Sequence, residues 1–339
     1  MTSLVAKRPA AGRVGRLGAG ALALVVLLLL AFAHLELGAR DVPLATLVEA
    51  LMAYNPEQFE HFIIREMRLP RLLIALVVGA ALAVAGALMQ GVTLNPLAAP
   101  DILGVNLGAS LAVVLATAFG LGSLETLPWF AFSGALFTSL LVYLIGSLGR
   151  SGATPLKLTL AGVAVSAFLG AMMSAGHLLH EAGFERLRVW LAGTLAGRDL
   201  DVFAAALPYL VVGFVLALLL ARQVTALALG ADVARGLGIH TARLRVLALG
   251  CVVLLCGAAV TVTGPIGFIG LVVPHMVRTF VGLDYRWVVP LSALVGAAVL
   301  TAADIVARVL LAPQELATGI VTALVGAPIF VALVRWQVR

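Results

Sequence analysis

The stretch Leu17–Leu35, LGAGALALVVLLLLAFAHL, runs for 19 residues without Asp, Glu, Lys or Arg. A helix of that length rises about 28 Å, close to the ~30 Å thickness of bilayer hydrocarbon. The rest of the chain has the same character, because 62% of its 339 residues are hydrophobic and 11% are charged. One globular interior does not hold that much apolar surface. The sequence therefore predicts an all-α integral membrane protein.

A cleaved signal peptide is the alternative interpretation of this stretch. Basic residues precede it, and Ala31-Phe32-Ala33 resembles a small-residue cleavage site. The apolar run nevertheless exceeds the usual signal-peptide core of roughly 7 to 15 residues, and many further apolar segments follow. We therefore expect residues 1–16 to form a cytoplasmic tail and residues 17–339 to form a single transmembrane domain.

Ten apolar segments can be distinguished along the chain. They lie near residues 17–35, 70–90, 102–120, 127–148, 156–178, 202–221, 244–263, 266–283, 288–308 and 316–335. The eighth begins with GPIGFIGLVVPH, whose glycines and prolines predict a broken or partly spanning helix. Ten spans also divide into two sets of five, and the second set is then inverted relative to the first. The sequence contains no repeat strong enough to prove that duplication.

The basic residues predict the orientation of these spans. With the N-terminus in the cytoplasm, 14 of the 22 Lys and Arg residues fall on the inner side, whereas 12 of the 16 acids fall outside. This is the distribution of the positive-inside rule, and it places the C-terminus in the cytoplasm as well. The same split explains the net charge of +6 without a nucleic-acid partner.

The connection between the second and third segments is unusually polar. It reads QGVTLNPLAAPDILGVNLGAS, residues 90–110, and Pro96 and Pro100 interrupt helices there. It is either an ordinary helix-breaking loop or a shaped loop that enters protein or a water-filled cavity. The Gly-rich piece GVNLGAS suits close helix packing and favours the second interpretation.

A second segment of interest is the inner loop 222–243. Gly230 and Gly238 bracket a short helix-prone piece, and Arg235, Arg243 and Arg245 lie at the inner surface. These arginines alone are explained by topology. The bracketed helix is not, and it indicates a docking element for a cytoplasmic partner.

Three arginines stand on the face that should contain few of them. Arg68 and Arg71 flank the start of the second span, and Arg308 ends the ninth. Snorkelling of their long side chains to the interface is one explanation, and a functional role is the other. Asp304 lies four residues before Arg308, so the two also form a potential pair on one helix.

Several catalytic patterns are absent. HLLHE, residues 177–181, matches neither of the zinc-hydrolase helix motifs, so we expect no metal site, and contact with a passing ligand is the alternative for this segment. The phosphate-cradling G-x-x-x-x-G-K-[ST] loop and the G-x-S-x-G elbow do not occur. Asp304 is the only plausible ionisable group at membrane depth, whereas an ion-coupled transporter usually carries several. The energy source is therefore expected to be a separate protein.

Together these segments resemble a known family, the permease subunits of ABC importers for iron-siderophore complexes, haem and cobalamin. The resemblance rests on RLPRLLIALVVGAALAVAGALMQG, NPLAAPDILGVN, LTLAGVAVSA, WLAGTL, LALGADVARGLGI, GPIGFIGLVVPHMVR, DYRWVVPLSALVGA and ADIVARVLLAPQELATGIVTALVGAPIF. These motifs occur in the family's order from Arg68 to the C-terminus, about 80% of the chain.

The resemblance implies ten helices per subunit, a second identical or homologous permease subunit, two cytoplasmic ATPases that bind ATP and Mg, and a periplasmic solute-binding protein. No cofactor is implied for this chain. The family's coupling helix, which contacts the ATPase, corresponds to Gly230, Asp232, Ala234, Arg235 and Gly238. Arg68, Arg71 and Arg308 correspond to arginines that receive acidic residues of the binding protein.

The resemblance also implies two cytoplasmic gates and a pathway. One gate corresponds to Asn95 and Leu97, and the other to Thr154, Pro155 and Leu156, where Pro155 departs from the small hydroxyl residues of the cobalamin relative. The fifth span would line the pathway with Ser166, Met172, Met173, Ser174 and His177, and the tenth would help to form the subunit interface.

The expected function is that of a permease subunit in the bacterial inner membrane, with no enzymatic activity of its own. A ferric siderophore is the preferred substrate because those permeases are the most numerous members of the family. Haem or cobalamin is the alternative within the family. An ion-coupled transporter or channel that works alone is the alternative from another class.

Overall fold

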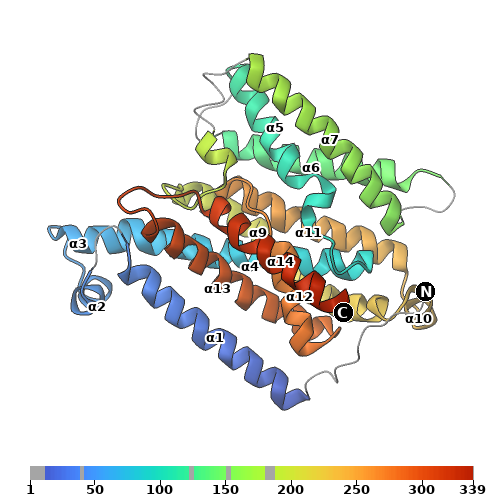
Figure 1. Ribbon diagram of the computed structural model, residues 1–339, viewed down its shortest axis with the longest axis horizontal. Coiled ribbons are helices and arrows are strands. Elements are labelled where there is room, and N and C mark those ends of the chain that lie inside the picture. The colour runs from blue at the N-terminus through green and yellow to red at the C-terminus, as the bar shows by residue number, and fades with distance from the viewer. Residues whose placement is uncertain (1–11, 39–41, 122–125, 150–153, 180–187, 339) are drawn as a thin grey trace.

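The computed structural model describes residues 12–38, 42–121, 126–149, 154–179 and 188–338 (Figure 1). Those residues form helices and connecting loops without a β-strand. The elements are α1 (Arg13–Glu36), α2 (Leu44–Met52), α3 (Phe59–Phe62), the π-helical η1 (Ile63–Arg68), α4 (Leu69–Thr93), the 3₁₀ turn η2 (Pro100–Leu103), α5 (Val105–Ala118), α6 (Leu127–Ser147), α7 (Pro155–Leu179), α9 (Leu200–Ala228), α10 (Ala231–Gly236), α11 (Thr241–Thr263), α12 (Ile269–Val281), α13 (Tyr285–Val309) and α14 (Thr318–Val338).

The apolar helices coincide with the ten predicted segments. Within the described ranges, seven are long and apolar enough to cross a membrane: Val14–Glu36, Phe59–Thr93, Leu127–Ser147, Leu156–Gly176, Leu200–Ala228, Thr241–Thr263 and Tyr285–Val309. Three shorter ones are Val105–Ala118, Ile269–Val281 and Thr318–Ala332. The prediction of an all-α membrane protein with about ten apolar helices is confirmed. The inverted relation of its two halves stays a prediction.

Two of the shorter helices follow breaks in the sequence pattern. α12 has 13 residues, about 20 Å, and begins only after the irregular loop 264–268, in which Gly264 and Phe268 have positive φ. The eighth segment is thus a partial helix, as its glycines and prolines predict. The third segment is shorter than predicted, because left-handed Gly104 separates η2 from the 14 residues of α5.

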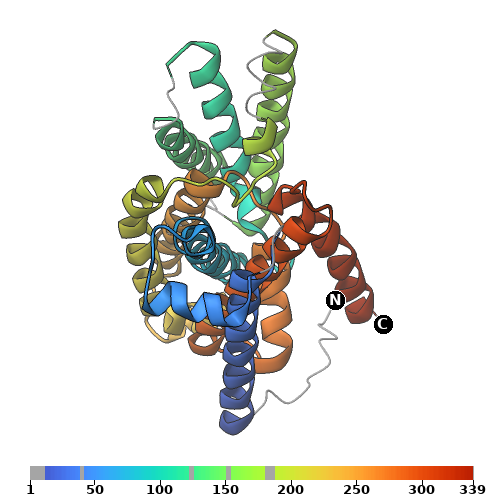
Figure 2. The ribbon, with the colours of Figure 1, turned by 90° about the vertical axis from the view of Figure 1, so that its left-hand side faces the viewer.

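Helix α4 forms the centre of the bundle. It packs against α9, α11, α12 and α13, and all of its residues from Ala81 to Thr93 are buried. The backbones of α4 and α12 touch at Gly86 and Gly270, where a Cβ on Gly86 would overlap the carbonyl of Gly270. The helices α5, α6 and α7 form a separate sector that packs on the centre through α11, and α1 lies at the periphery against α13 (Figures 1 and 2).

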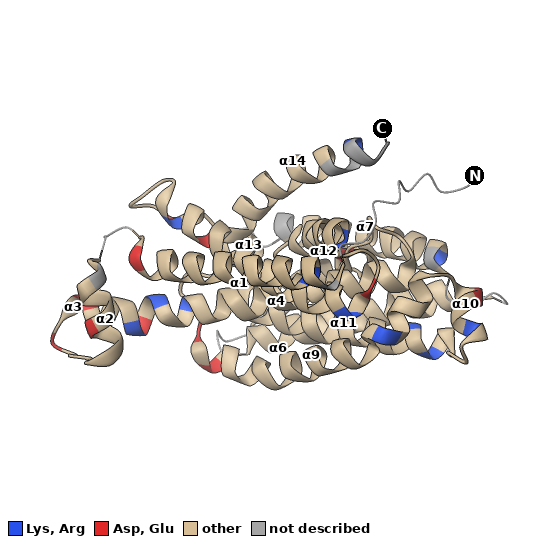
Figure 3. Cartoon of the chain, turned by 90° about the horizontal axis from the view of Figure 1, so that it is seen from below, with Lys and Arg blue, Asp and Glu red and all other residues tan. Residues whose placement is uncertain are grey.

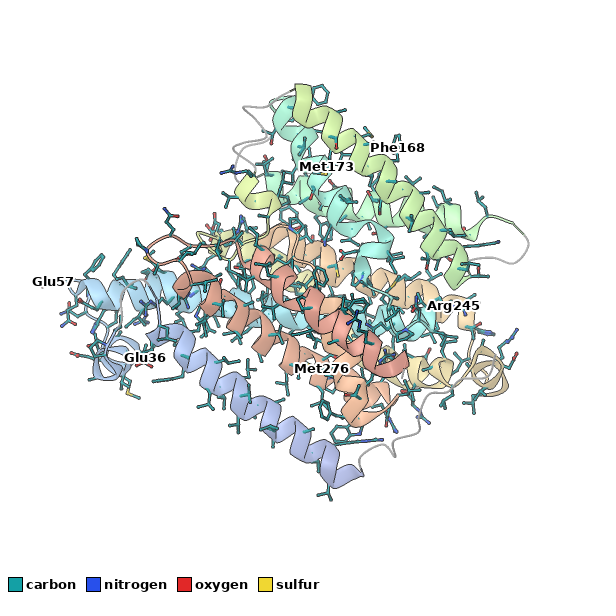
Figure 4. The ribbon with its side chains drawn as sticks, in the orientation of Figure 1. Glu36, Glu57, Phe168, Met173, Arg245 and Met276 are labelled. Carbon is teal, nitrogen blue, oxygen red and sulfur yellow. The ribbon has the colours of Figure 1, made fainter. Side chains whose placement is uncertain are left out.

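The two ends of the bundle differ in charge. Lys and Arg gather at the end that carries α10, whereas most of the acids lie at the opposite end, near α2 and α3 (Figure 3). We call these the α10 end and the α2 end. Figure 4 shows Glu36 and Glu57 at the α2 end and Arg245 at the α10 end. At the α10 end, Arg16 Nη1 donates to Asp284 Oδ2 across 3.3 Å and ties α1 to α13.

Asp284 is a stable partner for that contact. Arg286 donates to both of its oxygens across 2.9 Å, and these hydrogen bonds hold the pKa of Asp284 below its usual range. The carboxylate therefore remains ionised at neutral pH.

Candidate functional site

The segment bracketed by Gly230 and Gly238 is a short helix at the α10 end, as the sequence predicts. Gly230, with a φ of 129°, precedes α10, and Gly238, with a φ of 78°, follows it. Both values lie in the region that favours glycine, so the two residues reverse the chain on either side of the helix. Asp232 and Arg235 form an exposed ion pair at 2.6 Å, and Leu237 is 66% exposed. α10 therefore presents charged and apolar side chains outside the bundle.

Ala234 does not belong to that presented surface. It is fully buried, and α10 packs through this side against the end of α9. The expectation that Ala234 contacts an ATPase is thus not supported by its position in this chain. Its small side chain instead lets α10 lie close to the bundle, while Asp232 and Arg235 face outward.

At the α2 end, the predicted arginines meet around Asp304. This carboxylate is fully buried and accepts hydrogen bonds from Arg71 Nε at 2.8 Å, from Arg71 Nη2 at 2.9 Å and from Thr318 Oγ1 at 2.9 Å. The His34 Nε2 atom lies 2.9 Å from Asp304 Oδ2. One carboxylate therefore joins α1, α4, α13 and the start of α14.

The other two arginines are buried in the same cluster. Arg68 is 6% exposed, and its Nη1 donates to the carbonyls of Leu35 and Glu36 at 2.6 Å each. Arg308 is 4% exposed and donates from Nη2 to the His34 carbonyl at 2.8 Å. Both side chains thus satisfy carbonyls at the C-terminal end of α1, where a helix carries partial negative charge. Neither offers its guanidinium to an external partner in this conformation, whereas Arg71 donates from Nη1 to Glu315 at the surface of the bundle.

The local pair of Asp304 and Arg308 contributes less than its spacing suggests. Their closest atoms are 3.6 Å apart, beyond ordinary hydrogen-bond distance, whereas Arg71 binds Asp304 through two short bonds. Sequence reasoning missed His34, Glu315 and Thr318 as members of the cluster. The available signal for His34 was a titratable residue near the end of an otherwise uncharged run.

The predicted gate residues lie on two segments. One follows the C-terminal end of α4, and the other includes the start of α7. After left-handed Leu94, Asn95 Oδ1 accepts a hydrogen bond from the Leu97 amide at 2.9 Å, and Leu97 is exposed. Thr154 precedes α7, and its Oγ1 lies 3.4 Å from the Lys157 amide. Pro155 occupies the first position of α7, where proline fits a helix start, and Leu156 is exposed.

The loop that follows Asn95 enters the bundle. η2 packs against α7, and the carbonyl of Ile102 meets Gly162, where a side chain would overlap it. The polar connection 90–110 is therefore a shaped loop rather than a plain helix break.

Asp101 stands in a recess that sequence reasoning did not identify. The recess is shallow and opens to solvent, and its lining includes the apolar side chains of Leu82, Ile266 and Phe268. Asn106 Nδ2 donates to Asp101 Oδ1.

The five predicted pathway residues of α7 do not share one face. Ser166 and Met173 are half-buried and seven residues apart, so they lie on the same side of the helix. Met172 and Ser174 point elsewhere and are exposed. Figure 4 shows Met173 and Phe168 on α7, in the outer sector of the bundle. The side chain of His177, and His180 and Glu181 as a whole, lie outside the described residues.

Among the described residues, no three His, Cys, Asp or Glu side chains are arranged to hold a metal ion. Cys251 and Cys256 are free thiols buried inside α11.

The family assignment follows from comparison with known proteins. The model of the FecCD transport family matches residues 24–336, nearly the whole chain. The chain belongs to the FecCD transport family. The siderophore transport system permease protein YfiZ of Bacillus subtilis (strain 168) is 45% identical over 288 residues, 85% of this chain and 86% of that protein. The ferric enterobactin transport system permease protein FepD of Escherichia coli (strain K12) is 43% identical over 318 residues, 93% of this chain and 95% of that protein.

The fold of this FecCD-family chain also matches a solved structure. A protein described as a metal-chelate type ABC transporter in an inward-facing conformation superimposes with a TM-score of 0.81 and 29% identity, over 94% of this chain and 99% of that one. The chain is thus a multi-pass membrane permease of the FecCD family, and its role is transport.

Proposed function

We propose that this chain is the permease subunit of an ATP-binding-cassette importer that carries ferric siderophore complexes into the cytoplasm. The observation that carries the proposal is α10, a short helix held outside the bundle by Gly230 and Gly238 with an exposed ion pair and Leu237 on its surface. In a chain without a nucleotide-binding loop, such a helix is suited to receive force from a separate ATPase.

The proposed assembly contains two permease subunits, two cytoplasmic ATPases with their ATP and Mg, and a periplasmic binding protein. The binding protein would dock at the α2 end, where Arg71 is the most accessible arginine of the Asp304 cluster. Closure of the ATPases would move α10, and the segments at Asn95 and Leu97 and at Thr154 to Leu156 would then admit the substrate. This scheme places both termini and α10 on the cytoplasmic side of the inner membrane.

The substrate class is inferred from the named relatives. YfiZ and FepD are named for siderophore and ferric enterobactin transport, and both align with most of this chain. Haem and cobalamin remain the alternatives. The test is uptake by proteoliposomes that contain the chain, its ATPase and its binding protein. ATP-dependent uptake of a ferric siderophore, but not of haem or cobalamin, is the expected result. Uptake of haem or cobalamin alone would contradict the substrate assignment.

An ion-coupled transporter is the alternative from another class, and Asp304 was its one plausible intramembrane site. Both oxygens of Asp304 accept hydrogen bonds from Arg71, and Thr318 and His34 occupy further positions around them. A carboxylate with these partners is already neutralised and hydrogen-bonded. Asp304 is therefore better suited to holding the helices together than to carrying an ion.

A further inference from the structure

The guanidinium of Arg71 has two edges with different surroundings. Its inner edge donates from Nε and Nη2 to the fully buried Asp304, across 2.8 and 2.9 Å. Its outer edge donates from Nη1 to Glu315 Oε2, across 2.8 Å. The side chain of Arg71 is 11% exposed and that of Glu315 is 35% exposed. Arg71 is thus fixed on the inside and presents one donor edge at the surface.

The carboxylates of Asp304 and Glu315 differ in how readily another group can replace them on Arg71. The Asp304 contact is buried and two-pronged, so breaking it would strand charges without water. The Glu315 contact is at the surface, where ion pairs are weak and water competes for both partners. Only Glu315 can leave Arg71 without disturbing the buried cluster.

The chain around Glu315 allows that exchange. Glu315 lies on the exposed connection between α13 and α14, with Leu310 and Leu311 also exposed on it. The residues that follow are held independently, because the Leu316 amide donates to Ala307 O at 2.9 Å and Thr318 Oγ1 donates to Asp304. Movement of the Glu315 carboxylate therefore leaves the start of α14 in place.

We propose that Glu315 occupies a carboxylate site on Arg71 that an acidic side chain of the solute-binding protein takes when it docks, so that Glu315 is an internal competitor that weakens docking. This inference rests on the proposed function, since it requires a binding protein at the α2 end. Arg71 is the receptor, Asp304 positions it, and Glu315 sets how easily it is reached. When the binding protein docks, its carboxylate replaces that of Glu315 on the outer edge of the Arg71 guanidinium.

The test is the equilibrium binding of the binding protein to the complete transporter in lipid nanodiscs. The variant Glu315→Gln removes the competing charge and is expected to tighten binding about two- to fivefold, the effect of one exposed ion pair. The matched control is Glu57→Gln, which removes another exposed acid from the α2 end. It is expected to leave the affinity unchanged. Arg71→Lys, which keeps the charge but loses the two-edged fork, is expected to weaken binding.

A double variant separates direct competition from general electrostatics. In the Arg71→Lys background, Glu315→Gln is expected to produce a smaller gain than in the original chain, because the shared edge is gone. The inference is overturned if Glu315→Gln leaves the affinity unchanged or weaker, if Glu57→Gln tightens it equally, or if the gain is the same in both backgrounds. If the unaltered transporter does not bind the binding protein at all, the proposed docking itself is wrong, and this inference is wrong with it.

Discussion

At the scale of single residues, Asp304 holds the α2 end together. A carboxylate buried in a membrane helix is costly unless it is paired and hydrogen-bonded. Here Asp304 is surrounded by His34 of α1, Arg71 of α4 and Thr318 of α14. The position therefore serves stability first, and it orients Arg71 as a consequence.

Removal of the Asp304 charge tests this role. Asp304→Asn leaves Arg71 and Arg308 without their buried counter-charge, and we expect a loss of about 3–5 kcal/mol of stability, as for other broken buried pairs. The measurement is the thermal unfolding temperature of the purified chain in detergent. Asp232→Asn, which removes a solvent-exposed partner of Arg235, is the control and should unfold at the original temperature. Equal unfolding temperatures for the two variants would contradict a structural role for Asp304.

The sequence identified the basic members of this cluster but not their partners. Arg68, Arg71 and Arg308 were evident because arginines are rare on that face of the membrane. The contacts of Arg68 and Arg308 with the last carbonyls of α1 could not be predicted, because they join residues more than 30 and 270 positions apart. Burial of those two side chains is likewise a property of the packed helices rather than of any local pattern.

At the scale of elements, close backbone contact fixes the relation between α4 and α12. α12 is a partial helix, and Gln90 of α4 donates from Nε2 to the carbonyl of Leu271 at 3.1 Å. Gly86 and Gly270 allow the backbones to meet one turn before Gln90, toward the N-terminus of α4. The glycine- and proline-rich start of the eighth segment predicted the break, whereas the partner surface on α4 required the structure.

Gly86→Ala tests that contact. The added methyl group overlaps the backbone of Gly270, and we expect a loss of about 1–3 kcal/mol, as for overpacking in other cores. Gly250→Ala in α11 is the matched control, because nothing lies near its Cβ position. Helix propensity favours that alanine by about 1 kcal/mol. The comparison is made by thermal unfolding, and a Gly86→Ala chain as stable as the Gly250→Ala chain would show that the two helices do not meet as described.

The exposed surface of α10 is the proposed contact with the ATPase, so a charge reversal there should weaken that contact. Arg235→Glu reverses a charge on the proposed coupling helix without disturbing buried residues. Co-purification of the ATPase and ATP-dependent uptake should each fall about tenfold, the effect of a roughly 1.4 kcal/mol contact. Arg243→Glu makes the same charge change on the neighbouring inner surface and is expected to have a smaller effect. Equal losses in both variants would indicate a general effect of charge rather than a contact through α10.

At the scale of the whole molecule, the distribution of charge predicts which end faces the cytoplasm. Basic residues gather at the α10 end, and acids at the α2 end (Figure 3). Composition and the ten apolar runs were enough to predict the helical bundle. They were not enough to predict that α4 is central or that α5, α6 and α7 form a separate sector. Helices of similar hydropathy have the same sequence pattern wherever they pack in the bundle.

Orientation is measured by labelling single introduced cysteines in spheroplasts with a membrane-impermeant maleimide. Glu57→Cys, at the α2 end, is expected to react from outside, and Leu237→Cys, on the α10 surface, only after the membrane is permeabilised. The unaltered chain is the blank, because Cys251 and Cys256 are buried. The reverse pattern of labelling would place α10 outside and exclude contact with a cytoplasmic ATPase.

The central claim is that a separate ATPase drives transport through this chain. Its most direct test is ferric siderophore uptake into proteoliposomes in the presence of the binding protein, with and without the ATPase, and with imposed proton or sodium gradients. The account predicts uptake that requires both the ATPase and hydrolysable ATP with Mg and that persists when the ion gradients are dissipated. Uptake that continues without the ATPase and follows an ion gradient would contradict it.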